Sequence, residues 1–300
     1  MKSLFIDCNH QLAPVFARVH RPGDPQITVN TKPFVSEDLP RLLDGYAVCL
    51  DDHSYMPTPL VAQCRNLKHI VFLGTGAASY MNIAELGELG IKVHIIKGYG
   101  DTAVAEHTIA LMFAAARDLA RMDRAVRAGA WKPLEGVQLL GKTLGVIGLG
   151  GIGREVARIA KGIGMNVVVY NRSKISDASV SQVDIDTLLV QSDIVSMNLA
   201  LSDETRGFLD AGRIARMKPG VILVNTARAA LVDEAAMLAA LVSGQIGHAA
   251  LDVYHAEPLK ADHPLVRVQN VTLSAHAAFR TPEASMTLLR RAIDIVASLQ

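Results

Sequence analysis

Short apolar runs alternate with longer mixed stretches along the first third of the chain. The runs cover residues 4–6, 47–50, 69–72 and 93–96, and each is bounded by proline, glycine, aspartate or asparagine. Runs of this length with such boundaries are typical of buried strands. Strands that alternate with helices predict a parallel sheet that is covered by helices on both faces.

A break at residues 98–100, Gly-Tyr-Gly, is followed by a long segment that contains few helix-breaking residues. Apolar residues recur along this segment, at Val104, Ile109, Met112, Ala116 and Leu119. We therefore predict one long helix over residues 102–127, and its apolar character suggests burial against another domain or another subunit.

The second half of the chain repeats the strand and helix pattern more regularly. Six candidate strands cover residues 143–147, 167–170, 194–197, 221–224, 249–253 and 271–273. A helix is expected over about residues 153–162, and a final helix follows Thr281, its predicted N-cap, with Pro282 at its first position. That last helix is expected to pack back on the first domain. We thus predict two doubly wound α/β domains with a cleft between them, one from residues 1–97 and 280–300 and the other from residues 98–279.

A glycine motif lies between the first strand and the first helix of that second half. Residues 148–153, Gly-Leu-Gly-Gly-Ile-Gly, fit the pattern G-x-G-x-x-G. The first glycine permits a tight turn, the second lets backbone amides approach a pyrophosphate, and the third lets the helix lie close to the strand. The helix then offers unpaired N–H groups to the phosphates. This arrangement predicts a dinucleotide site.

The end of the next strand bears on the choice of cofactor. An NAD site usually has an acidic residue here, which binds the ribose 2′-hydroxyl. This chain has Asn171, Arg172, Ser173 and Lys174, and the next acidic residue is Asp177. Because a guanidinium can bind a 2′-phosphate that a carboxylate would repel, the segment favours NADP(H), with NAD(H) as the alternative.

Composition narrows the class of protein further. The 300 residues include 30 basic and 29 acidic side chains, so a net charge of +1 gives no sign of a nucleic-acid partner or an anionic membrane surface. The apolar stretches are too short for a membrane span, and residues 1–7 leave no room for a secretory signal. Three cysteines without metal-ligand spacing are expected to be buried thiols. A cytoplasmic protein without a metal site is the prediction.

Three residues after predicted strand ends could carry out chemistry. Arg228, Glu257 and His276 follow successive strands, and residues at the carboxyl ends of strands face the ligand crevice of such sheets. Reduction of a 2-keto acid needs a proton donor, and histidine titrates near neutral pH. A carboxylate could orient that histidine, and an arginine could bind the substrate carboxylate through two hydrogen bonds.

Nearly the whole chain beyond residue 70 resembles the D-isomer-specific 2-hydroxyacid dehydrogenase family. The matching segments, in family order, are residues 73–76 (Leu-Gly-Thr-Gly), 104–107 (Val-Ala-Glu-His), Trp131, 148–153, 217–220, 225–228 (Asn-Thr-Ala-Arg), 251–253, 257–258 and His276. The resemblance implies that Arg228, Glu257 and His276 are the catalytic residues. It also implies a homodimer, with the long helix and the Trp131 region at the interface.

The resemblance further implies which residues bind the ligands. Cofactor contacts are expected from Val104, Gly148, Gly150, Gly151, Ile152, Gly153, Asn171, Arg172, Ser173, Leu199, Ala200, Thr205, Thr226, Ala227, Arg228, Asp252 and His276. Substrate contacts are expected from Leu73, Gly74, Thr75, Gly76, Arg228 and His276. The basic segment at residues 171–174 is similar to that of the NADPH-dependent glyoxylate and hydroxypyruvate reductases of the family.

Three departures from the family pattern affect loops rather than reacting groups. Ala229 stands where a glycine is usual, Ala275 replaces a proline, and residues 198–201 replace a His-x-Pro-Leu pattern. The leading hypothesis is an NADPH-dependent reductase of small 2-keto acids such as glyoxylate or hydroxypyruvate. One alternative is an NAD-dependent dehydrogenase of a bulkier 2-hydroxy acid, and another is a non-catalytic protein that senses dinucleotides.

Overall fold

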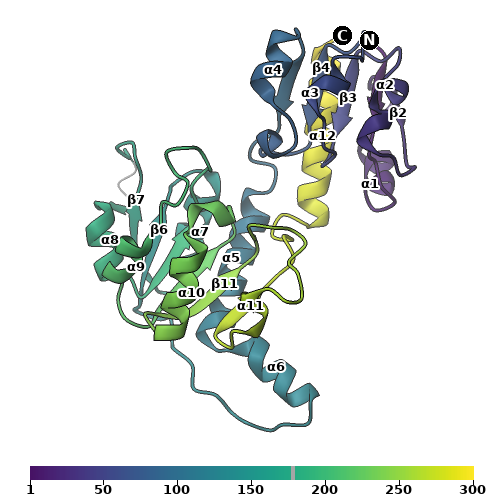
Figure 1. Cartoon of the computed structure of the whole chain (residues 1–300). Coiled ribbons are helices and arrows are strands. Elements are labelled where there is room, and N and C mark those ends of the chain that lie inside the picture. The colour runs from purple at the N-terminus through teal and green to yellow at the C-terminus, as the bar shows by residue number, and fades with distance from the viewer. Residues whose placement is uncertain (177–179) are drawn as a thin grey trace. The chain divides into compact units, whose positions relative to one another are not determined.

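A computed structural model describes residues 1–176 and 180–300 (Figure 1). The chain forms two compact units, one made of Met1–Gly100 with Arg280–Gln300 and the other made of Asp101–Phe279. Each unit is built around its own parallel sheet. The predicted class, two parallel-sheet α/β domains, is confirmed.

The first unit contains a sheet of five strands in the order β2-β1-β3-β4-β5. The strands are β1 (Ser3–Phe5), β2 (Ile27–Val29), β3 (Val48–Asp51), β4 (His69–Phe72) and β5 (Lys92–Ile95). The helices are α1 (Leu12–Val19), α2 (Leu39–Leu42), α3 (Thr58–Val61), α4 (Ile83–Glu88) and α12 (Pro282–Ser298), with 3-10 turns η1 (Ser36–Asp38) and η2 (Ala77–Ser79). All four predicted strands are present, and the short edge strand β2 was missed.

Both faces of this sheet are buried. Phe5 and Leu50 pack into one apolar cluster, and their neighbours Leu4 and Cys49 pack into another on the opposite face. This is why the strands appear as continuous apolar runs instead of alternating with polar residues. Cys8, Cys49 and Cys64 are all buried free thiols, as expected.

The C-terminal helix α12 belongs to the first unit. Thr281 Oγ1 accepts a hydrogen bond from the Ala284 amide at 3.1 Å, and Pro282 begins the helix, so the predicted cap is confirmed. Leu289 and Ile293 of α12 lie in the same apolar cluster as Phe5. The prediction that this helix packs on the amino-terminal segment is therefore correct, and Figure 1 shows α12 beside α1 and the strands.

The second unit contains a sheet of seven strands in the order β12-β11-β10-β9-β6-β7-β8. The strands are β6 (Thr143–Ile147), β7 (Asn166–Tyr170), β8 (Ser181–Gln182), β9 (Ile194–Met197), β10 (Val221–Asn225), β11 (Ile246–Leu251) and β12 (Val271–Leu273). The helices are α5 (Asp101–Ala116), α6 (Leu119–Arg127), α7 (Gly151–Gly162), α8 (Ile185–Gln191), α9 (Ala211–Arg216), α10 (Glu234–Ser243) and α11 (Pro264–Arg267), with the 3-10 turn η3 (Ala229–Leu231). All seven strands are parallel, and successive strands are added on one side of β6 up to β8 and on the other side from β9 onward. The point between β6 and β9, where this order switches, is where such folds bind ligands.

The single long helix predicted over residues 102–127 is wrong. Two helices, α5 and α6, occupy this segment, and Asp118 between them has a left-handed backbone with φ of 49°. Aspartate tolerates this conformation better than most residues, so the break needs neither glycine nor proline. Ala105 and Met112 of α5 pack into the core of the second unit itself, and burial of the segment against another domain or subunit stays a prediction.

Candidate active site

Three neighbouring strands of the second sheet end at one edge. Asn225 of β10 is paired with Leu251 of β11, and Leu251 is paired with Leu273 of β12. The residues that follow these three positions therefore leave the sheet side by side. Arg228, Glu257 and His276 all lie in the segments that begin here.

Glu257 and His276 are in direct contact. Oε2 of Glu257 lies 2.6 Å from Nδ1 of His276, and Oε1 accepts a hydrogen bond from the Tyr254 amide at 2.9 Å. The two side chains are 35 % and 37 % exposed, so the pair borders solvent and a ligand could reach it. Because both carboxylate oxygens are engaged, the imidazole has a defined orientation. Nδ1 faces Glu257, and Nε2 is the second nitrogen of the ring.

The backbone at His276 is held in a turn. Its φ is 49°, a left-handed conformation that costs a residue other than glycine about 1–2 kcal/mol. The next two amides compensate, because Ala277 N donates to Asp252 Oδ1 at 3.0 Å and Ala278 N donates to Asp252 Oδ2 at 2.9 Å. Asp252 thus fixes the direction in which the imidazole leaves the chain.

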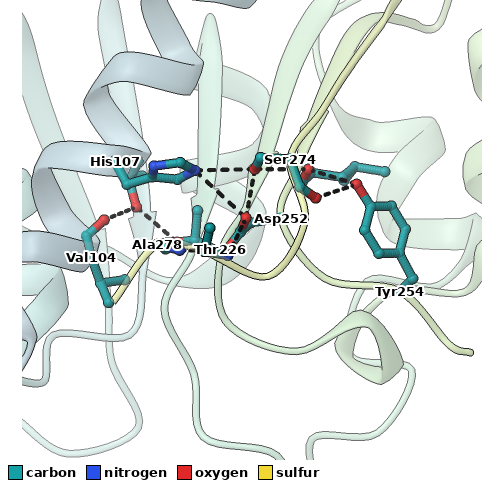
Figure 2. Close-up of polar contacts among 10 residues, drawn as sticks. Val104, His107, Thr226, Asp252, Tyr254, Ser274 and Ala278 are labelled. Carbon is teal, nitrogen blue, oxygen red and sulfur yellow. Dashed lines mark hydrogen bonds and ion pairs between the residues drawn. The ribbon is translucent and has the colours of Figure 1, made fainter. Parts of the chain in front are cut away.

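Asp252 is fully buried at the end of β11. Burial by itself raises the pKa of this carboxyl, but the nearby His107 side chain and hydrogen bonds from Ser274 and the two amides outweigh it and hold the pKa below its ordinary value. The group is therefore a carboxylate whose oxygens are occupied by its own chain (Figure 2). Its expected contact with the cofactor stays a prediction.

Tyr254 makes hydrogen bonds at the same edge of the sheet. Its hydroxyl donates to the Ser274 carbonyl at 2.7 Å and lies 3.1 Å from the Leu251 carbonyl (Figure 2). Burial, together with the negative charges of Asp252 and Glu257, raises the pKa of Tyr254. The phenol therefore acts as a neutral hydrogen-bond donor that ties the ends of β11 and β12 together.

Arg228 follows β10 and is half-buried. Its carbonyl accepts a hydrogen bond from the Asn225 side chain at 3.0 Å, and its Nη1 donates to the Ala227 carbonyl at 2.7 Å. Thr226, just before it, is buried and shares a 2.7 Å hydrogen bond with Thr108 of α5. Arg228 therefore follows the strand next to β11, the strand that leads to Glu257, and Asn225 holds its backbone carbonyl.

The glycine turn between β6 and α7 fits a dinucleotide. Gly148 has φ of 97°. A β-carbon on Gly153 would lie 2.1 Å from the Gly148 carbonyl oxygen, and one on Gly151 would lie 1.8 Å from Asp101 Oδ2. A β-carbon on Gly150 would meet no heavy atom of the described residues within 4 Å, so the space beside this glycine is open. Gly150 is also the N-cap of the twelve-residue helix α7, so a helix N-terminus and open space coincide where a pyrophosphate would bind.

The predicted 2′-phosphate segment follows β7. Asn171 Oδ1 accepts a hydrogen bond from the Leu149 amide at 3.2 Å, and Gln182 Nε2 donates to the carbonyls of Asn171 and Ser173, both at 3.0 Å. A pocket of about 650 Å³ opens here, lined by Tyr170, Asn171, Arg172, Lys174, Gln182, Val183, Asp184 and Thr187. Asp177 lies outside the described residues.

Arg172 has a partner that sequence reasoning missed. Its Nη1 lies 2.6 Å from Oε2 of Glu204, and the side chains are 83 % and 74 % exposed. Glu204 belongs to the segment after β9 that also holds three predicted cofactor residues. There, Thr205 Oγ1 donates to the Ala200 carbonyl at 2.7 Å, and Leu199 packs against the core. Only the tertiary fold brings Glu204 to Arg172, so no local sequence signal could have revealed it.

The remaining predicted residues lie on several elements. Val104 is buried on α5, and Ile152, the second residue of α7, packs against the apolar core. The predicted substrate residues 73–76 follow β4 in the first unit, where Leu73 is buried and the Gly74 carbonyl accepts a hydrogen bond from the Ile96 amide at 2.9 Å. Sequence reasoning gave no role to Tyr254 or Ser274, and it noted His107 only as part of a motif.

Comparisons with known proteins agree with the fold and the glycine turn. The model of the family "D-isomer specific 2-hydroxyacid dehydrogenase, NAD binding domain" matches residues 109–278. A hydroxypyruvate reductase of Thermotoga maritima is 40 % identical over 225 residues, which are 73 % of this chain and 73 % of that protein. A D-3-phosphoglycerate dehydrogenase of Archaeoglobus fulgidus is 39 % identical over 84 % of this chain, and the chain spans only 49 % of that protein.

A solved structure also matches along the whole chain. It is an acyclic imino acid reductase, Bsp5, in complex with NADPH and D-Arg, and it aligns with a TM-score of 0.86 and 27 % identity over 100 % of this chain and 97 % of that one. The family model and the hydroxypyruvate reductase together define the class as an oxidoreductase with an NAD-binding α/β domain. The chain belongs to the D-isomer specific 2-hydroxyacid dehydrogenase family. The prediction of an NAD(P)-dependent enzyme of this family is confirmed. Separately, none of the helices described is both long and apolar enough to cross a bilayer.

Proposed function

We propose that the chain reduces a small 2-keto acid of the glyoxylate or hydroxypyruvate type to the D-2-hydroxy acid, with NADPH as the preferred cofactor. The observation that carries the proposal is the 2.6 Å contact between His276 Nδ1 and Glu257 Oε2, at the carboxyl edge of the sheet. The hydroxypyruvate reductase of Thermotoga maritima supports the substrate class. Asp101–Phe279 would bind the dinucleotide, and the expected substrate contacts of residues 73–76 stay a prediction.

The proposed roles follow from the charges in the reaction. A bound nicotinamide supplies the hydride. Negative charge develops on the carbonyl oxygen, and His276 delivers a proton to it from Nε2 while Glu257 holds Nδ1. Arg228 pairs with the substrate carboxylate through two parallel hydrogen bonds and polarises the adjacent carbonyl. A small substrate needs few further contacts.

Support for NADPH comes from the residues at the end of β7. Arg172 is exposed beside Asn171 and Ser173, which can add hydrogen bonds to a 2′-phosphate. The ion pair with Glu204 favours a second candidate, an NAD-dependent dehydrogenase, because a carboxylate close to Arg172 competes with that phosphate. The two candidates differ in which nicotinamide gives the higher kcat/KM.

The test is a substrate panel combined with one substitution. Glyoxylate, hydroxypyruvate, pyruvate and phenylpyruvate are assayed with NADPH and with NADH. We expect the small keto acids to be reduced faster with NADPH, and His276→Gln to lower kcat by about 10²–10⁴-fold. A clear preference for NADH would contradict the cofactor assignment. Activity of His276→Gln near the wild-type rate would contradict its role, and lack of all reduction would favour the dinucleotide-sensing alternative.

We also propose that the chain forms a homodimer through the surface around α6. Large apolar side chains are exposed on α6 and along the segment that follows it, with Leu119 at 50 %, Val126 at 53 %, Trp131 at 89 % and Leu140 at 64 %. The proposed interface rests on this exposure. A location in the cytoplasm stays a prediction.

A further inference from the structure

A histidine outside the proposed catalytic set reaches the edge of the sheet from α5. His107 Nε2 lies 3.0 Å from Ser274 Oγ and 3.6 Å from Asp252 Oδ1. Its side chain is 29 % exposed, and the carboxylate beneath it is not exposed at all. Figure 2 shows the imidazole directed at Ser274 and Asp252.

The position of the protons in this cluster follows from counting donors. Ser274 has one hydroxyl hydrogen, and its oxygen lies 2.5 Å from Asp252 Oδ1, the short distance typical of a hydroxyl that donates to a carboxylate. With that hydrogen used, Ser274 Oγ can only accept from His107. Nε2 of His107 must therefore carry a hydrogen, and the donors run from His107 to Ser274 to Asp252.

This chain of hydrogen bonds ends at the backbone that carries His276. Asp252 accepts from the Ala277 and Ala278 amides at 3.0 and 2.9 Å, and Ser274 lies two residues before His276. The left-handed turn at His276 thus lies between Ser274, which donates to Asp252, and the Ala277 and Ala278 amides, which also donate to Asp252. A change at His107 can therefore reach the imidazole through these contacts.

We propose that His107 is a positioning residue, whose Nε2–H orders Ser274 and Asp252 and thereby fixes the turn that aims His276. The proposal rests on the proposed role of His276 as proton donor. It adds to that role a residue on a different element, 169 positions earlier in the chain. His107 itself would touch neither the substrate nor the reacting atoms.

Three variants separate the positioning role from a general loss of stability. His107→Phe keeps a ring and removes the donor, whereas the side-chain amide of His107→Gln can donate to Ser274. His248→Phe is the matched control, because His248 Nε2 makes a similar bond of 2.9 Å to Thr272 Oγ1 between β11 and β12, away from the proposed catalytic pair. Should His107→Phe fail to fold, Ser274→Ala interrupts the same chain with a smaller change.

The first measurement is kinetic. We expect His107→Phe to lower kcat by about 10²-fold with KM within a factor of about 3, because misplacing a catalytic group chiefly slows the chemical step. The kinetic isotope effect from deuterated NADPH should rise, which a smaller fraction of folded enzyme would not cause. His107→Gln should restore most of kcat, and His248→Phe should leave kcat and the isotope effect unchanged. An unchanged kcat in His107→Phe, or an equal loss in His107→Gln, would overturn the proposal.

The second measurement needs no activity. Amide hydrogen exchange of Ala277 and Ala278 in the protein without ligands should speed up at least about tenfold in His107→Phe and not in His107→Gln. Equal protection in all variants would overturn the positioning role. Because this readout is independent of turnover, it still tests His107 if the wild-type chain reduces no keto acid and the proposed function fails.

Discussion

Glu257 holds His276 by its Nδ1 atom, at 2.6 Å, while a backbone amide holds the other oxygen of the same carboxylate. A carboxylate fixed at both oxygens sets the orientation of the ring. The proposed role of His276 as a general acid rests on this geometry.

Glu257→Gln should slow reduction without abolishing cofactor binding. The amide has no charge to stabilise the imidazolium, so we expect kcat to fall by about 10²-fold while the Kd for NADPH changes by less than about twofold. Steady-state kinetics and a fluorescence titration measure the two quantities. Glu234→Gln is the matched control, because Glu234 lies 3.5 Å from His263 in another carboxylate and histidine pair. Retention of more than a third of kcat in Glu257→Gln would contradict the assigned role.

Glu204→Gln should increase the preference for NADPH. The carboxylate of Glu204 lies 2.6 Å from Arg172 and would both compete with and repel a 2′-phosphate. Since an exposed ion pair is worth about 1 kcal/mol or less, we expect the Kd for NADPH to fall by about three- to fivefold and the Kd for NADH to stay unchanged. The effect should shrink at high salt. Asp186→Asn, which breaks the exposed pair of Asp186 with Arg216 at 2.8 Å, should change neither constant. Equal tightening of both cofactors would show that Arg172 does not bind the phosphate.

Asp51→Asn should stabilise the protein above pH 5. Asp51 is fully buried, and its Oδ2 has no hydrogen-bond partner among the described residues. Burial, and then the charge of Asp7, raises the pKa of Asp51 well above its ordinary value. The unfolded chain therefore releases this proton at lower pH than the folded chain, so the free energy of unfolding falls as pH rises toward the folded pKa. Asparagine is neutral in both states and can donate to Asp7.

Thermal unfolding as a function of pH checks this prediction. We expect the Tm of Asp51→Asn to exceed that of the wild type by about 2–4 °C at pH 8, and the difference to vanish near pH 3. A substitution at Asp24 should change the Tm in the opposite direction, because hydrogen bonds from Arg290 lower the pKa of Asp24 to about 2. Asp24→Asn should therefore be less stable than the wild type at neutral pH, and its deficit should disappear as pH falls toward 2. A Tm difference for Asp51→Asn that does not depend on pH would contradict the prediction.

Trp131→Glu should weaken the proposed homodimer. Trp131 is 89 % exposed, and a charge there would be costly to bury against a partner. We expect sedimentation velocity to show a shift from dimer to monomer at micromolar concentration. Val242→Glu is the control, because Val242 is 84 % exposed on α10 without belonging to the α6 surface. A wild-type chain that sediments as a monomer would disprove the dimer itself.

Most of the sheet could be predicted from the sequence because buried parallel strands are continuous apolar runs. The two strands that were missed lack that signal. β2 has one buried residue among three, and β8 consists of two exposed polar residues, Ser181 and Gln182. Asp118 shows the same limit for helices, because a left-handed aspartate leaves the apolar pattern around it intact.

The proposed catalytic residues could be predicted for a different reason. Residues at the ends of parallel strands meet at one edge whatever the loops do, so Glu257 and His276 could be placed together without knowledge of the turn between them. Their supports could not be placed in this way. Glu204 reaches Arg172, and His107 reaches Ser274, only through packing of elements that are distant in the chain.

The place of α12 in the first unit has a consequence for synthesis. Leu289 and Ile293 form one wall of the core around Phe5, yet the ribosome makes them after the whole of Asp101–Phe279. All residues of Asp101–Phe279 are already joined by then, so the middle of the chain can complete its core first. Until α12 emerges, residues 1–100 therefore expose on the nascent polypeptide the apolar face that α12 later covers.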